Sequence, residues 1–100
     1  MMCCHFCVKK CYISCIATLE SFIRQFCKNH GLRLNKDLGQ HFLIDETVLG
    51  AIIEAGKIAE TDHVVEIGAG IGILTRELLK KTKRVTSIEI DAKLIPYLHL

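Results

Sequence analysis

The chain has 100 residues, of which 50% are hydrophobic and 24% are charged, and its formal net charge is +2. This composition excludes a disordered or collagen-like chain, and the length suits one small domain. The charge is unevenly divided, because residues 1–36 carry six bases and one acid whereas residues 37–100 carry seven bases and ten acids. A basic N-terminal arm of this kind suits either RNA phosphates or an ordinary solvated face.

The N-terminal arm contains all six cysteines, and four of them recur at every fourth position: Cys3, Cys7, Cys11 and Cys15. On a helix this spacing places the thiols along one face. Thiols at such spacing could bind zinc. A structural zinc site usually has two pairs of ligands, however, and the nearest candidate for the second pair is Cys27 with His30. Cysteine also packs as a small hydrophobe. We therefore expect no metal, and the arm is interpreted either as a packed extension or as the result of a start codon assigned too far upstream.

The sequence also predicts the cellular compartment of the protein. No segment reaches the roughly 18 uninterrupted apolar residues that a membrane span requires, and Lys9 and Lys10 interrupt the apolar N-terminal run. We expect a cytoplasmic monomer without a membrane partner. Its thiols should be reduced in that compartment.

Two amphipathic helices are expected before the first strand. Apolar residues recur at helical spacing through residues 17–30, and Gly31 stands where a left-handed C-terminal cap belongs. After an irregular stretch to Leu43, Asp45 suits the N-cap of a second helix that runs to about Ile58. The apolar face of that helix comprises Val48, Leu49, Ile52, Ile53 and Ala55.

The second half of the sequence predicts one βαβ unit. Residues 63–67 form a short β-branched strand, residues 71–81 a helix, and residues 84–90 a second strand. Because crossovers between parallel strands are short and right-handed, the two strands should be parallel neighbours. The residues of the helix expected to face inward are Ile73, Leu74, Leu78 and Leu79.

A glycine-rich turn follows the first strand directly and contains Gly68, Gly70 and Gly72. Such a turn lets a ligand approach the main chain without obstruction by a Cβ atom. Glu89 lies 21 residues after Gly68, at the end of the neighbouring strand, where a carboxylate can accept both hydroxyl hydrogens of a ribose. The combination predicts a nucleoside cofactor.

The residue that distinguishes between cofactors is Ile73. A dinucleotide fingerprint would need Gly or Ala at that position for close contact between strand, helix and pyrophosphate. The run from Glu66 to Gly72 instead has the E-x-G-x-G-x-G form usual in class I methyltransferases. Glu66 either shapes the glycine turn or interacts with the cofactor, and the sequence favours neither role.

The sequence from residue 36 onward resembles the ribosomal RNA adenine dimethyltransferase family. Three motifs carry the resemblance in order and spacing: Lys-Asp-Leu-Gly-Gln-His-Phe-Leu-Ile-Asp at residues 36–45, the glycine motif, and Val-Thr-Ser-Ile-Glu-Ile-Asp at residues 85–91, with Leu94-Ile95-Pro96 after it. The Gly-Gln-His-Phe-Leu segment is the most specific of them, because class I methyltransferases in general lack it.

The resemblance implies an α/β fold, an incomplete Rossmann-like class I methyltransferase domain made of N-terminal helices and one βαβ unit. It places the N-terminal part of that domain at residues 36–100, after a Cys-rich extension at residues 1–35. The implied cofactor is S-adenosylmethionine. The residues that the resemblance assigns to the cofactor site are Gln40, His41, Leu43, Glu66, Gly68, Gly70, Gly72 and Glu89; His41 stands where many family members have Asn.

Family members transfer two methyl groups to N6 of adjacent adenines in small-subunit rRNA, which makes that RNA the expected partner. Their catalytic motif, typically Asn-Leu-Pro-Tyr, does not occur in this sequence. We therefore expect no catalytic residue within these 100 residues and no turnover by the chain alone. Two alternatives are a large-subunit rRNA methyltransferase of the macrolide-resistance branch and a non-catalytic rRNA-binding assembly factor.

Overall fold

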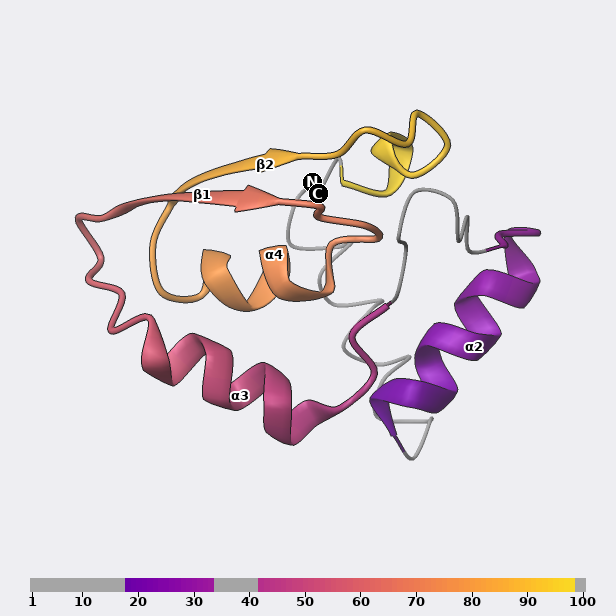
Figure 1. Ribbon diagram of the computed structural model, residues 1–100, viewed down its shortest axis with the longest axis horizontal. Coiled ribbons are helices and arrows are strands. Elements are labelled where there is room, and N and C mark those ends of the chain that lie inside the picture. Colours follow the sequence, from indigo (N-terminus) through magenta and orange to yellow (C-terminus); the bar gives the residue numbers. More distant parts are fainter. Residues whose placement is uncertain (1–17, 34–41, 99–100) are drawn as a thin grey trace. The chain divides into compact units, whose positions relative to one another are not determined.

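The computed structural model describes residues 18–33 and 42–98, which Figure 1 shows as coloured ribbon. The chain forms two compact units that divide between Glu46 and Thr47. Two groups of predicted residues lie outside the described parts of the chain. They are the cysteines of the repeating pattern at positions 3–15, and Gln40 with His41.

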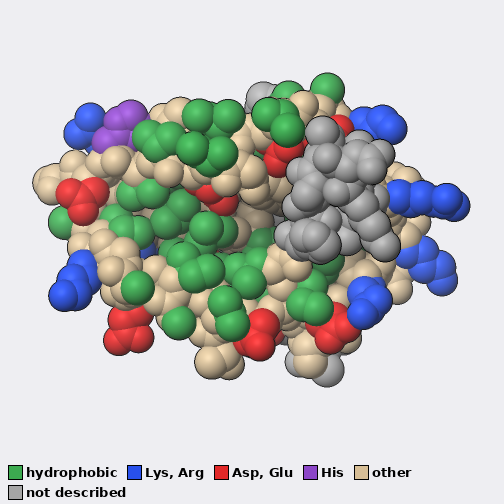
Figure 2. Space-filling view, viewed as in Figure 1, with side chains coloured by type: hydrophobic (Ala, Val, Ile, Leu, Met, Phe, Trp, Pro, Cys, Tyr) green, Lys and Arg blue, Asp and Glu red, His purple; other side chains and the backbone are tan. Residues whose placement is uncertain are grey.

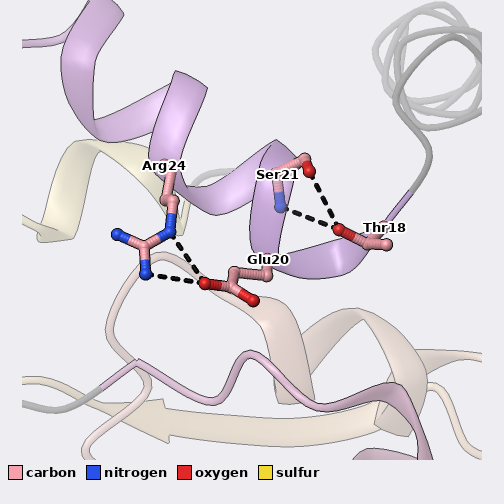
Figure 3. A network of polar contacts seen from close by, with 4 residues as sticks. All are labelled: Thr18, Glu20, Ser21 and Arg24. Carbon is pink, nitrogen blue, oxygen red and sulfur yellow. Dashed lines mark hydrogen bonds and ion pairs between the residues drawn. The ribbon is translucent and has the colours of Figure 1, made fainter.

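The main element of the first unit is helix α2, Leu19–Asn29, which confirms the first predicted helix. Thr18 is its N-cap, and the Thr18 hydroxyl accepts a hydrogen bond from the Ser21 N–H at 3.1 Å. On the next turn Glu20 and Arg24 form an ion pair with N and O atoms 2.6 Å apart (Figure 3). Both contacts stabilise the start of a helix.

The C-terminal end and the buried face of α2 also agree with the prediction from the sequence. Gly31 has φ +61°, the left-handed conformation predicted for the C-terminal cap. The buried residues of α2 are Leu19, Phe22 and Ile23, and their spacing of three, four and one residues places them on one face.

Helix α3, Glu46–Ala55, is three residues shorter at its C-terminal end than predicted. Gly56 and Lys57 turn the chain there, and Lys57 has φ +44°. The predicted apolar face is wrong in part, because Leu49 is buried while Val48 and Ile52 remain 45% and 42% exposed.

The second unit contains the βαβ motif: strand β1, His63–Ile67, helix α4, Ile73–Leu79, and strand β2, Arg84–Ile88. The strands are parallel, as predicted, with a register that runs from His63↔Arg84 to Ile67↔Ile88. The helix begins two residues later than predicted, because Gly72 is left-handed at φ +83° and a helix cannot continue through it. It also ends at Leu79 and not at Lys81, and β2 ends two residues before Ile90.

Helix α4 lies on one side of the two strands (Figure 1). Glu66 is buried, whereas its neighbours Val65 and Ile67 are 56% and 82% exposed, so successive residues of β1 face opposite sides. Ile88 and Ile90 are exposed as well. Figure 2 shows hydrophobic side chains at the surface over the strands. The expectation that Leu79 points inward is wrong, since this last residue of α4 is 41% exposed.

A buried threonine connects the two turns that lead into the strands. The Thr82 hydroxyl donates to the carbonyl oxygen of Asp62 at 2.6 Å and accepts from the Arg84 N–H at 3.1 Å. After β2 the chain forms a short 3-10 helix, η2, Ile95–Tyr97. Within the described residues, none of the helices has the length and apolar character needed to cross a membrane.

Candidate cofactor-binding site

The candidate site is built around the glycine loop, residues 68–72, which joins β1 to α4. Gly68, Gly70 and Gly72 have φ values of +78°, +60° and +83°. Residues with a Cβ atom rarely adopt such angles. The sequence folds into this loop because glycine occupies each of the three left-handed positions.

Hydrogen bonds within the chain fix the shape of the loop. The Gly68 N–H donates to the carbonyl oxygen of Ile88 at 2.8 Å, and the Gly72 N–H donates to that of Ala69 at 3.0 Å. The Gly70 N–H donates to Oε2 of Glu89 at 2.7 Å. The N–H groups of all three glycines are therefore paired within the chain. What the loop offers a ligand is therefore close approach to its main chain.

Two of the glycines differ in what surrounds them. A Cβ atom built on Gly68 would have no atom within 4 Å. A Cβ atom on Gly72 would meet Cδ2 of Leu98 at 3.3 Å and the side chain of Thr75 at 3.8 Å. The open side of the loop is thus at Gly68, where a ligand can approach, whereas the absence of a Cβ at Gly72 leaves room for Leu98 and Thr75.

Glu89 stands just beyond the end of β2 and is half-buried. Its Oε2 accepts from Gly70, and its Oε1 accepts from the Asp91 N–H at 2.9 Å. An ionised carboxylate has about four lone-pair positions, so these main-chain bonds use two of them. The two that remain match the two hydroxyl groups of a ribose. Together with the open side of Gly68, this carboxylate fits a nucleoside cofactor.

Glu66 lies in β1, two residues before the loop, and is only 7% exposed. Its Oε2 accepts from the hydroxyl of Thr75 at 2.5 Å and from that of Ser87 at 2.9 Å. Neither Thr75 nor Ser87 was predicted as a functional residue. Ser87 could have been predicted from the sequence, because it lies 21 residues after Glu66 and is its partner in the parallel strand register. No comparable sequence signal identified Thr75.

The other predicted residues are placed as follows. Ile73, the residue that argues against a dinucleotide, is 7% exposed at the start of α4. Leu43 is half-buried in the segment that precedes α3. Cys27 is half-buried on α2, where burial raises the pKa of its thiol. Within residues 18–33 and 42–98, no three His, Cys, Asp or Glu side chains are gathered as metal ligands.

Comparison with known proteins identifies similar sequences over most of the chain. The family model of the ribosomal RNA adenine dimethylase matches residues 31–99. "Ribosomal RNA small subunit methyltransferase A" of Clostridium botulinum (strain Langeland) is 51% identical over 75 residues, which are 75% of this chain and 27% of that protein. The protein of the same name from Shouchella clausii is 54% identical over 71 residues, 71% of this chain and 24% of that protein.

A solved structure is similar as well. The crystal structure of a dimethyladenosine transferase from Plasmodium falciparum matches with a TM-score of 0.56 and 43% identity over 58% of this chain and 21% of that chain. This likeness confirms the predicted fold class, a partial Rossmann-like α/β domain. The chain spans about a quarter of the length of the curated relatives that it matches.

Proposed function

The chain belongs to the ribosomal RNA adenine dimethylase family, and from this premise we propose that it supplies the S-adenosylmethionine-binding part of an enzyme that dimethylates N6 of adenines in small-subunit rRNA. The observation that carries the proposal is the pairing of the open glycine loop at Gly68 with the carboxylate of Glu89. Residues 36–100 form this part in the proposal, after an extension at residues 1–35.

The proposed binding roles differ from residue to residue. Glu89 accepts the ribose hydroxyl hydrogens through the lone pairs that its main-chain bonds leave over. Gly68 gives room for the ligand next to the main chain. The family resemblance adds Gln40, His41 and Leu43 to the proposed site. When bound, S-adenosylmethionine supplies the activated methyl group, and these residues bind and orient it.

The choice of S-adenosylmethionine over a dinucleotide rests on Ile73. Its branched side chain is buried at the start of α4, where a dinucleotide fingerprint has Gly or Ala. Calorimetric titration of the chain with S-adenosylmethionine and, separately, with NAD tests this. We expect heat of binding with the first ligand and none with the second. Binding of NAD alone would refute the proposal.

The rRNA part of the proposal can be tested with a chimera. Residues 31–99 of this chain would replace the matching segment of the Clostridium botulinum relative, which is named as a small-subunit rRNA methyltransferase. We expect the chimera to form N6,N6-dimethyladenosine in undermethylated small ribosomal subunits, as measured by mass spectrometry. A chimera that binds S-adenosylmethionine and methylates only large-subunit rRNA would favour the macrolide-resistance branch instead.

A further inference from the structure

The buried carboxylate of Glu66 connects three elements of the second unit. It belongs to β1, and its Oε2 accepts hydrogen bonds from Thr75 on α4 and Ser87 on β2. Thr75 is itself 5% exposed. Burying a carboxylate costs free energy unless hydrogen bonds compensate it, so the two hydroxyl donors make this side chain tolerable inside the unit.

The hydrogen bond between Glu66 and Thr75 spans the glycine loop. Glu66 comes two residues before Gly68, and Thr75 comes three residues after Gly72. The Glu66–Thr75 bond therefore joins the two ends of the loop across all three left-handed glycines. Ser87, which is paired with Glu66 in the strand register, ties the same carboxylate to β2.

Glycine loses more conformational freedom than other residues when it becomes ordered. If the ends of a loop with three glycines were not fixed, the loop would become ordered only when the ligand binds. The free energy that this ordering costs would weaken the affinity. Both bonds of Glu66 run to side chains of α4 and β2, on the side of β1 opposite to the exposed Val65 and Ile67. This arrangement accounts for an acidic residue before the first glycine without a contact to the ligand.

We propose that Glu66 is a positioning residue, which holds the glycine loop in its binding shape through Thr75 and Ser87 and acts on cofactor affinity through them. The inference rests on the proposed function, because the affinity concerned is that for S-adenosylmethionine. It assigns to Thr75 and Ser87 an effect on binding that neither residue would have if Glu66 contacted the cofactor directly.

Thr75→Val tests this inference, because valine keeps the shape of threonine and removes the hydroxyl donor. In calorimetric titrations at a temperature where circular dichroism shows the native helix content, we expect S-adenosylmethionine to bind about tenfold more weakly, the effect of one hydrogen bond to a charged group. Thr75→Ser retains the donor and should bind within about twofold of the wild type. Ser87→Ala removes the other donor at a less buried position and should also weaken binding, which covers the case of a Thr75→Val chain that does not fold.

The matched control is Thr86→Val. Thr86 is next to Ser87 on β2 but faces the exposed side, where its hydroxyl is hydrogen-bonded to His63. We expect unchanged affinity for this variant. If the wild type does not bind S-adenosylmethionine, the proposed function fails and the inference with it. Wild-type affinity in Thr75→Val and Ser87→Ala, even with lowered melting temperatures, would overturn the inference alone. Weaker binding by Glu66→Gln without any effect of the two hydroxyl variants would likewise overturn it, in favour of direct contact.

Discussion

The carboxylate of Glu89 accepts a hydrogen bond from the main-chain N–H of Gly70, with the two atoms 2.7 Å apart. This bond joins the residue just beyond β2 to the middle of the glycine loop, while the other oxygen of the same carboxylate is bonded to Asp91. Glu89 therefore supports the loop in addition to its proposed contact with a ribose. A substitution at this position removes both contributions at once.

Replacement of Glu89 by Ala should weaken S-adenosylmethionine binding by about 1.5–3 kcal/mol, the range for hydrogen bonds to a charged group. Isothermal titration calorimetry of the 100-residue chain measures the change. Glu54→Ala is a suitable control, because Glu54 is an exposed carboxylate on α3. Equal affinities of the wild type and Glu89→Ala would remove Glu89 from the site.

Gly68→Ala should abolish or strongly weaken cofactor binding, because the added Cβ enters the open side of the loop at a left-handed φ of +78°. Gly31→Ala is the matched control, since Gly31 is also left-handed, at φ +61°, with no atom within 4 Å of the added Cβ. Both variants should lose about 1–2 kcal/mol of stability from backbone strain. Only Gly68→Ala should lose affinity, and an equal loss in both would show that strain alone explains the effect.

Thr82→Val should lower the free energy of unfolding by about 1–3 kcal/mol, because it removes the hydrogen bonds that the buried hydroxyl makes to the main chain. Thr82 is 2% exposed and bonds to the main chain of Asp62 and Arg84. Urea denaturation followed by circular dichroism gives the value. Thr82→Ser should retain most of the stability, and the exposed Thr61→Val should change it by less than about 0.5 kcal/mol. Similar midpoints for Thr82→Val and the wild type would contradict the role of this hydroxyl.

The 100-residue chain should transfer no methyl group to RNA, even where it binds S-adenosylmethionine. Its sequence has no Asn-Leu-Pro-Tyr motif, and orientation of the weakly nucleophilic adenine N6 is the main catalytic resource in this reaction. Incubation with tritiated S-adenosylmethionine and undermethylated small subunits tests this, with the chimera as the positive control. Incorporation that Glu89→Ala abolishes would place the catalytic groups within these residues.

The sequence predicted the elements of the fold well where local signals are strong. Gly31 ends α2 as predicted, through cap chemistry that depends on neighbouring residues alone. The parallel pairing of β1 and β2 followed from the short crossover between them. The end of α3 was predicted less well, because the positive φ of Lys57 is not encoded in helical periodicity.

The cofactor site remains a prediction, and the sequence could not give the hydrogen bonding around its residues. Spacing singled out Gly68 and Glu89 as candidates, yet it could not show that the Gly70 N–H is paired with Glu89. Spacing also could not show that Gly68 and Gly72 differ in their surroundings. A Cβ atom added to Gly72 would meet Leu98, whereas one added to Gly68 would meet nothing. That difference depends on a residue 26 positions further along the chain, and only the folded structure brings the two together.

Each residue of β1 pairs with the residue 21 positions further along the chain, from His63↔Arg84 to Ile67↔Ile88. Contacts between residues that are close in sequence form faster than those between distant ones. At ordinary rates of protein synthesis, 21 residues leave the ribosome in about 1–4 s. The strand that precedes the glycine loop therefore waits only a few seconds for its partner, so that the two strands next to the loop can pair soon after both have been made.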